Sequence, residues 1–430
     1  MFGAALLFAI TVCAAPPPAL FLNAIPIQSP LAVCNDGSPT PIYYRNCSAN
    51  WDTKGPDYCA NITNRWVIVF AGDDVRGALR GEPDGPAPAF PAGAFCYDGG
   101  SCASRAPALR TSAGLPKSGF PGGFLSPYAE VNPNFYKSSS VVIPYCSSDL
   151  FLGNTTANGT HFRGAEILNS ALTALLALPN RSSLAFADEV FVVGGAGVIS
   201  QLPRIRARLL AAKRAAVGGG GGGGGAPPLL LRGVCDGCAL LPDLPGAPSP
   251  PRCERDNDCP PSEALPRGMA LWGAGGGPPW RSLAAPALLA ATAAAGLPLL
   301  AFAQEFDAVA LSAYGAWGGG ANGSGAAWAR RTYAPALRAA LRGSLPAPPR
   351  GAAFVGACAA WPPALALAGG AWYGELAACK DGAGRAHNNT PAQVAAAFSG
   401  CLEGAPQEFC LSCGGGGGGS GGCALDAWAL

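Results

Sequence analysis

The segment 188-DEVFVVGGAGVIS-200 carries the strongest fold signal in this sequence, because it passes from strand to glycine turn to helix. Its apolar run, Val190 to Val193, breaks at 194-GGAG-197, and helical spacing of apolar residues follows from Gln201 to Ala212. In α/β enzymes such a turn presents either a nucleophile or a phosphate cradle. The segment therefore predicts an α/β protein with a functional turn at residues 194–197.

Other segments supply elements that fit the same fold. Short apolar runs predict buried strands at 66–70, 140–143, 190–193 and 229–231, and helical periodicity covers 165–178. Strands that alternate with helices indicate a mostly parallel central sheet with helices on both faces. Because ligands bind at the carboxyl ends of strands in such sheets, the turn at 194–197 and the pair Asp73-Asp74 are both expected there.

The composition fits a globular protein and argues against some classes of partner. The chain has 430 residues, 49% of them hydrophobic, which is enough to bury a large core. The formal net charge is only +2 and no long basic run occurs, so neither nucleic acid nor an anionic membrane surface is indicated. We expect one domain over residues 16–412, with a flexible glycine insertion at 218–225 and a glycine-rich tail over 413–430.

The amino-terminal residues 1-MFGAALLFAITVCAA-15 predict a secretory signal, since an apolar run precedes small residues. The run is too short to span a bilayer, and prolines at 16–18 end it. The alanine-rich tract 283–303 is long enough, but Pro286 and Pro298 interrupt it, so we expect it to be part of the core. The sequence thus predicts an extracellular or cell-wall location without a membrane span.

Cysteines and sequons agree with secretion. The chain has 17 cysteines. Apart from the one in the signal, they are an even set that allows disulfides throughout, although the pairing cannot be deduced. The CxxC pairs 235–238 and 410–413 lack matching histidines, so disulfides are favoured over zinc and no metal is expected. Glycosylation is permitted at the sequons Asn46, Asn61, Asn154, Asn158, Asn180, Asn322 and Asn388.

A dinucleotide cradle is the first interpretation of the glycine turn, because VVGGAGVIS resembles a GGxGxxG motif. Its context is wrong, since Ser200 replaces the third glycine, no Tyr-x-x-x-Lys pair occurs, and the turn does not follow a first strand. Nicotinamide cofactors also do not suit a secreted, disulfide-rich protein. No cofactor is therefore expected.

A nucleophile elbow is the second interpretation, and a family resemblance supports it. The segments that carry the resemblance are 34-CNDGSPTPIYY-44, 66-WVIVFAGDD-74, 132-NPNFYKSSSVVIPYCSSD-149, 161-HFRGAEI-167, 190-VFVVGGAG-197, 231-LRGVCDG-237 and 354-FVGACAAW-361. In this order they resemble the conserved blocks of the pectin acetylesterase family, which includes the Notum-like carboxylesterases. The resemblance implies a disulfide-stapled, α/β-hydrolase-like fold and hydrolysis of acyl esters, from pectin or from an acylated signalling protein.

The same resemblance implies a serine, histidine and aspartate triad, whose positions can be carried over to this chain. The nucleophile's position falls on Ala196, the orienting acid on Asp236, and the histidine on Trp361. Alanine has no oxygen to attack a carbonyl, and an indole N–H cannot accept a proton. Only the acid is retained, so the resemblance predicts a decayed triad.

The resemblance also places an oxyanion loop and a substrate cleft. The loop falls on Gly72, Asp73 and Asp74, where two carboxylates replace residues of a glycine-rich pattern. Negative charge there opposes an oxyanion, although adjacent loop carboxylates are more often solvated than used in acid-base chemistry or metal binding. The cleft falls on Ser147, Ser148 and Asp149, where an aspartate after serines is also typical of an ordinary turn or helix cap.

No other residue in the sequence is an obvious replacement for the missing groups. Ser200 lies about one helical turn beyond Ala196 and lacks a base. Of the two histidines, His161 belongs to a block that we interpret as structural, and His387 lies beside a sequon in an expected loop. Hydrolysis by the family mechanism is therefore not expected.

Three functions follow as hypotheses. The first is a catalytically impaired family member that binds an acylated extracellular glycan or an acylated protein. The second is an active polysaccharide O-deacetylase, and the third is a non-catalytic structural glycoprotein. Ester hydrolysis and saturable binding of acylated ligands distinguish the three.

Overall fold

The computed structural model describes most of the chain between residues 22 and 356 and two short segments near the end. The described residues are 22–45, 64–71, 79, 95–119, 125–127, 132, 135–179, 182–217, 228–236, 238, 240–241, 244–247, 253, 259–274, 279–304, 311, 313–316, 327–344, 351–356, 410–411 and 425–429. The predicted signal at 1–15 and the glycine insertion at 218–225 lie outside them. Five of the sequons also lie outside, and only those at Asn154 and Asn158 are described.

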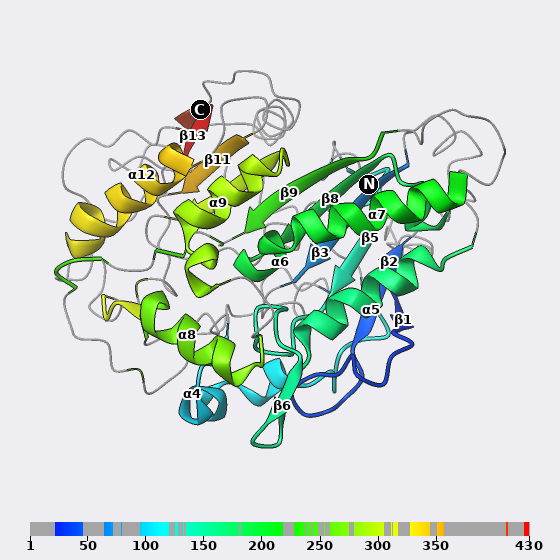
Figure 1. Cartoon of the computed structure of the whole chain (residues 1–430), viewed down its shortest axis with the longest axis horizontal. Helices are drawn as coiled ribbons and strands as arrows, with labels where there is room; N and C mark the ends of the chain where they lie inside the picture. The colour runs from blue at the N-terminus through cyan, green and yellow to red at the C-terminus, as the bar shows by residue number, and fades with distance from the viewer. Residues whose placement is uncertain are drawn as a thin grey trace, which may run out of the picture.

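An 11-stranded sheet forms the centre of the molecule, in the order β12-β13-β11-β10-β9-β8-β3-β5-β2-β1-β4 (Figure 1). Its inner strands β11, β10, β9, β8, β3 and β5 are all parallel, and antiparallel strands flank them on both sides. The predicted mostly parallel sheet is thus confirmed by the strand pairing. Apolar runs such as Val190–Val193 are buried on both faces, which is typical of parallel strands.

The strands have the following bounds: β1 Leu22–Pro26, β2 Pro41–Arg45, β3 Arg65–Phe70, β4 Ser118–Gly119, β5 Ser139–Ile143, β8 Glu189–Gly194, β9 Leu230–Asp236, β10 Leu299–Gln304, β11 Gly351–Gly356, β12 Cys410–Leu411 and β13 Leu425–Ala429. A separate hairpin joins β6 Thr155–Ala157 to β7 Thr160–Phe162. The end of the predicted tail therefore forms a strand, β13, which pairs with β11.

The helices include both segments that helical periodicity predicts. Their bounds are α4 Gly99–Ser104, α5 Gly164–Leu176, α6 Ala196–Ser200, α7 Leu202–Val217, α8 Pro261–Leu271, α9 Ala285–Ala294 and α12 Ala334–Ser344, with shorter turns η3 Pro107–Arg110, η6 Leu184–Phe186, η7 Trp280–Leu283 and η8 Ala329–Tyr333. The alanine-rich tract 283–303 folds into α9 and β10 and belongs to the core, as predicted. Within the described part of the chain, no helix is both long and apolar enough to cross a membrane.

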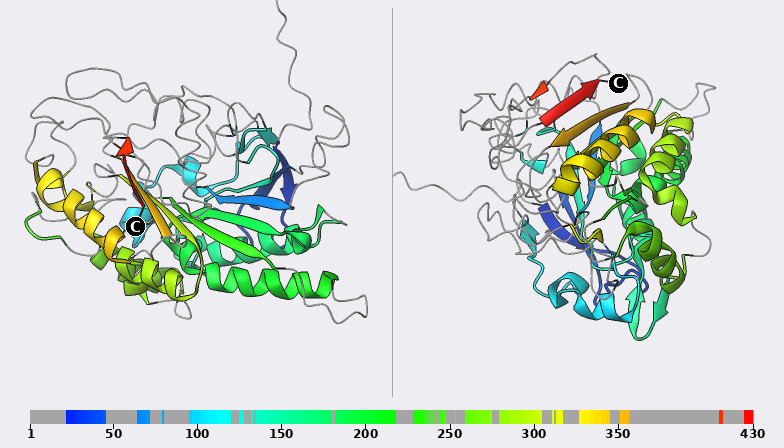
Figure 2. Two further views of the ribbon diagram at one scale, coloured as in Figure 1. Left: turned by 90° about the horizontal axis from the view of Figure 1, so that it is seen from above. Right: turned by 90° about the vertical axis from the view of Figure 1, so that its left-hand side faces the viewer.

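The main core lies between one face of the sheet and the helices α5, α6, α7, α9 and α12 (Figures 1 and 2). Alternate strand residues such as Ile68, Val190 and Val192 point into it. The opposite face is buried as well, with Val67 and Phe191 no more than 3% exposed. Among the residues that the structure describes, the helices that pack on the sheet lie on the first face, whereas the sequence predicts helices on both (Figure 2).

Disulfides link several loops. The described bridges are Cys34–Cys146, Cys96–Cys102, Cys235–Cys238 and Cys253–Cys259. The cysteines at 235 and 238 are therefore in a disulfide, the use that the sequence favours, and the structure shows that they pair with each other. The pair at 410–413 falls only partly within the described residues.

Candidate functional site

One edge of the sheet collects the segments in which the sequence predicts a site. Because β3, β8, β9 and β11 are parallel, their carboxyl ends lie at the same edge. Gly72 follows β3, the glycine turn follows β8, Asp236 ends β9, and Trp361 follows β11. β8 lies between β3 and β9, so the turn has the carboxyl end of β3 on one side and the end of β9, with the predicted acid, on the other.

Three of these positions are described only in part or not at all. Asp236 ends β9 opposite Phe302 of β10, which fixes its backbone at the edge. Residues 72–74 and Trp361, together with His387, lie outside the described residues. Their predicted roles therefore remain predictions.

The turn after β8 is sharp. β8 ends at Gly194 and α6 begins at Ala196, with Gly195 as its N-cap at φ −77° and ψ −175°. Among the described residues, no side chain caps this helix. Ala196 is 3% exposed and its methyl group belongs to the main core. The side chain at the predicted nucleophile position thus faces the interior instead of the edge.

The glycines on either side of the turn are explained by close packing. A Cβ on Gly194 would lie 2.9 Å from the Cβ of Val198. A Cβ on Gly197 would lie 1.9 Å from the carbonyl oxygen of Leu150, which belongs to the loop after β5. Both positions exclude a side chain, because real Cβ atoms essentially never approach a heavy atom within 3.0 Å. The glycine turn therefore serves close contact between backbone segments.

The loop after β5 holds the predicted cleft residues Ser147, Ser148 and Asp149, all of which are 0% exposed. Asp149 accepts hydrogen bonds on Oδ1 from Ser147 Oγ at 2.6 Å and from the backbone N–H of Phe151 at 3.1 Å. On Oδ2 it accepts from the N–H of Gly164, the first residue of α5, at 2.7 Å. The side chains are thus used to build the loop, and lining a cleft remains a prediction for them.

The electrostatics of Asp149 reflect its burial. Desolvation raises the pKa of the Asp149 carboxyl to about 7, although the hydrogen bonds from Ser147 and from backbone N–H groups oppose the shift. Glycine surrounds this carboxyl, since a Cβ on Gly153 would lie 2.4 Å from Oδ2 and one on Gly164 would lie 2.1 Å from Oδ1. Asp149 is therefore enclosed by protein, and its hydrogen bonds fix the loop.

The backbone of this loop is strained, and hydrogen bonds hold it. Ser148, Leu150 and Phe151 have φ of 52°, 56° and 60°, which is the left-handed region that non-glycine residues rarely adopt. Tyr145 Oη accepts a hydrogen bond of 2.8 Å from the N–H of Leu150. Gln201 Nε2, just beyond α6, donates to the carbonyl of Phe151 at 3.0 Å. The loop and the helix that follows the turn are therefore fastened together.

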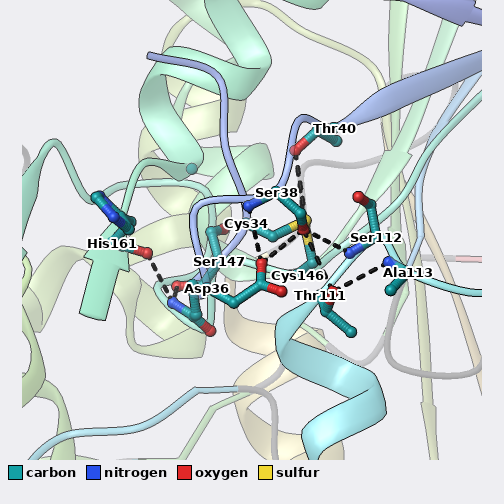
Figure 3. Close-up of a disulfide and its surroundings, with 12 residues drawn as sticks. Cys34, Asp36, Ser38, Thr40, Thr111, Ser112, Ala113, Cys146, Ser147 and His161 are labelled. Atoms are coloured by element: carbon teal, nitrogen blue, oxygen red, sulfur yellow. Dashed lines mark hydrogen bonds between the residues drawn. A yellow bond between two sulfur atoms is a disulfide. The ribbon is translucent and has the colours of Figure 1, made fainter. Parts of the chain in front are cut away.

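A disulfide and an asparagine connect the loop to the segment after β1 (Figure 3). Cys146 is bonded to Cys34, and the neighbouring Asn35 donates from Nδ2 to the carbonyls of Ser147 and His161 at 2.8 and 2.7 Å. The ring of His161 points away from the disulfide and pairs through Nδ1 with Thr156 Oγ1 at 3.0 Å. These contacts support the interpretation of His161 as a structural residue.

Two other places with reactive side chains, Ser200 and a group of cysteines with a glutamate, already have bonds within the protein. The hydroxyl of Ser200 donates to the carbonyl of Gly197 at 2.6 Å, so it bonds back along its own helix. Within the described residues, one group of possible metal ligands lies close together, namely Cys253, Cys259 and Glu263. The two cysteines form a disulfide, so neither offers a thiolate to a metal.

Comparison with known proteins gives a consistent set of relatives. A Pectinacetylesterase family model matches residues 89–216. The palmitoleoyl-protein carboxylesterase NOTUM of Schmidtea mediterranea is 30% identical over 250 residues, covering 56% of this chain and 38% of that protein. The inactive palmitoleoyl-protein carboxylesterase notum1b of Danio rerio is 26% identical over 132 residues, covering 30% of this chain and 71% of that protein.

A solved structure shows the same fold. The Wnt deacylase Notum from Drosophila superposes with a TM-score of 0.53 and 24% sequence identity, over 75% of this chain and 82% of that one. The matched region spans only 38% and 30% of the lengths of the NOTUM proteins of Schmidtea mediterranea and Drosophila melanogaster. The α/β-hydrolase-like fold predicted from the sequence is therefore confirmed.

Proposed function

Because this chain belongs to the pectin acetylesterase family, we propose that it is an extracellular carboxylesterase-like protein that binds an acylated partner and hydrolyses it poorly or not at all. Several of its relatives are named palmitoleoyl-protein carboxylesterases, and the matched family model is that of pectin acetylesterases. An acylated protein or an acylated extracellular glycan is the corresponding ligand class.

One observation carries the loss of hydrolysis. The turn at 194–197, where the family mechanism needs a nucleophile, contains only glycine and alanine. Neither residue type has a hydroxyl or thiol that can attack an ester carbonyl. The nearby hydroxyl of Ser200 is bonded to the carbonyl of Gly197. Removing a triad nucleophile costs on the order of a millionfold in turnover.

Two sequence features add to this proposal. The predicted histidine position holds Trp361, whose indole cannot act as a base, and the predicted oxyanion loop holds Asp73 and Asp74. Charge on that loop opposes the negative charge of a tetrahedral intermediate. Asp236 is retained, and in this proposal it is the remaining member of the triad.

Hydrolysis and binding are tested on the same preparation. The purified chain is given acetylated pectin, a nitrophenyl acetate and a fatty-acylated peptide, and we expect no release above buffer. Saturable binding of the acylated peptide or of acetylated pectin, absent with the deacylated forms, supports the proposed role. Turnover that disappears in Asp236→Asn or Ser200→Ala supports an active deacetylase instead. No turnover and flat titrations with both ligands support a structural glycoprotein.

The extracellular part of the proposal has its own test. The sequon residues Asn154 and Asn158 are both exposed: Asn154 immediately precedes β6, and Asn158 lies at the turn of the β6–β7 hairpin with φ 50°. In a secreting cell we expect glycan on Asn158, which Thr160→Ala removes by destroying the sequon. Thr155→Ala keeps both sequons and is the matched control. Protein that stays inside the cell and carries no glycan contradicts secretion.

A further inference from the structure

The turn between β8 and α6 consists of one residue. β8 ends at Gly194 and α6 begins at Ala196, so Gly195 alone lies between strand and helix. In a nucleophile elbow the reactive residue stands on this strand-to-helix turn, where its side chain is exposed above the carboxyl edge of the sheet. By its place in the chain, Gly195 is the residue at that point.

The space around the backbone gives an independent indication. Among the described residues, and apart from its two chain neighbours, a Cβ added to Gly195 would have no heavy atom within 4 Å. At Gly194 and Gly197 the nearest atoms would be 2.9 and 1.9 Å away. Among the glycines of this turn, Gly195 is thus the position with room for a side chain. Its φ of −77° and ψ of −175° are extended values that any residue adopts, so a side chain adds no backbone strain there.

Ala196 has a side chain, but its surroundings are apolar. It is 3% exposed and belongs to the same core as Val192 and Ile199. A hydroxyl there would be buried without a built partner, which is unfavourable.

From these observations we infer that Gly195, and not Ala196, stands where the nucleophile of a catalytic family member stands. The inference rests on the proposed function, since it identifies the position at which the reactive oxygen is missing. The residue after the nucleophile contributes its backbone N–H to the oxyanion hole of such elbows. That role falls to Ala196, so the turn keeps a backbone donor while it lacks the attacking atom.

A chemical probe tests the assignment without catalysis. Gly195→Cys and Ala196→Cys are each treated with iodoacetamide under native conditions, and alkylation at the introduced thiol is followed by peptide mass spectrometry. We expect alkylation of Gly195→Cys to be at least about tenfold faster, because an exposed thiol reacts directly whereas a buried one waits for local opening. The unmodified chain gives the background from its own cysteines.

Thermal unfolding of serine variants provides a second test, which remains informative if one of the cysteine variants folds poorly. The Tm of Gly195→Ser should stay within about 2 °C of the parent chain, whereas that of Ala196→Ser should fall by several degrees. Equal or faster alkylation of Ala196→Cys, or a larger loss of Tm in Gly195→Ser, overturns the assignment. The proposed function has a different test: ester hydrolysis by the unmodified chain would contradict it without affecting the assignment of Gly195.

Discussion

At the scale of single residues, Gly197 is explained by one contact between α6 and the loop after β5. The Leu150 carbonyl oxygen occupies the space that a Cβ on Gly197 would need, only 1.9 Å away. Carbonyl oxygens cannot rotate aside as flexible side-chain ends do. Gly195 differs, because a Cβ there would meet no atom of the described residues within 4 Å other than those of its chain neighbours. These two glycines, although separated by one residue, therefore exist for different reasons.

A pair of alanine substitutions tests this difference. Gly197→Ala should lower the free energy of unfolding by about 1–3 kcal/mol, because the loop must move to admit the methyl group. Gly195→Ala should leave it unchanged or raise it by at most about 1 kcal/mol, since it restricts the unfolded chain without a clash. Urea unfolding of both variants measures the effect. Equal losses in the two would contradict the packing described for Leu150.

Asp149 is the other residue that the local geometry isolates. Its carboxyl is 0% exposed and accepts hydrogen bonds from one hydroxyl and from backbone N–H groups. Burial nevertheless raises its pKa to about 7. The folded state therefore holds the proton over a pH range in which the unfolded chain, with a carboxyl pKa of about 4, has lost it.

The resulting pH dependence has a definite sign. The stabilisation that Asp149 provides is fully present below about pH 4 and is lost as the pH rises toward 7, where the folded-state carboxyl ionises. Asp149→Asn cannot titrate, so its stability deficit relative to the parent chain should shrink over this interval. An amide N–H₂ would also face backbone N–H donors, which adds a loss of about 1–3 kcal/mol at all pH values. Urea unfolding of both proteins between pH 4 and 8 measures this, and a deficit that widens with pH refutes the assignment.

At the scale of elements, β8 and α6 depend on segments far away in the sequence. The loop after β5 is fastened to α6 through Gln201, and to the segment after β1 through Asn35 and the Cys34–Cys146 disulfide. That disulfide closes a sequence separation of 112 residues, whereas Cys96–Cys102 closes only 6. The first bridge therefore constrains the unfolded chain far more than the second.

Removal of each bridge should show this difference. In the chain-entropy description, Cys34→Ala with Cys146→Ala loses about 4–5 kcal/mol, and Cys96→Ala with Cys102→Ala loses about 2 kcal/mol. Thermal and urea unfolding of the two double variants measure the losses. The short-loop variant is the matched control, because it removes the same number of sulfurs. A larger loss in that control would mean that native packing, and not chain entropy, dominates.

At the scale of the whole molecule, a family-type site needs side chains from separate strands of one sheet. The turn after β8, Asp236 at the end of β9 and the carboxyl end of β11 share one edge because their strands are parallel. Sequence separation between these segments is large, so only the sheet brings them to one edge. Loss of catalysis at one segment leaves the others in place.

Restoration of activity should accordingly require more than one segment. Gly195→Ser alone and Trp361→His alone should each give no turnover of a nitrophenyl ester above the parent chain. The double variant should hydrolyse it measurably, because triad members act as a unit and their effects are not additive. The matched control is Ala196→Ser with Trp361→His, which should remain inactive. Activity in that control and not in the double variant would return the nucleophile's position to Ala196.

Much of the architecture follows from local patterns in the sequence. β-branched runs such as 190–193 predict strands buried on both faces, and helical spacing predicts α5 and α7. The predicted helical spacing starts at Gln201 and corresponds to α7, which begins at Leu202. It does not include the short helix α6, which comes just before. The sequence predicts helices on both faces of the sheet, whereas the described helices pack on one face. Burial of the other strand face shows that something covers it but not which kind of element does so.

Residue type and local spacing were enough to predict the alternation of strands and helices and to show that the turn at 194–197 has no hydroxyl or thiol. The partner of each cysteine came from the folded chain. The folded arrangement was needed to show which residue of that turn has room for a side chain. Gly195 and Ala196 are neighbours in a segment of small residues, and nothing local distinguishes them. Their difference arises from atoms of other segments, namely the apolar core around Ala196 and the open space at Gly195.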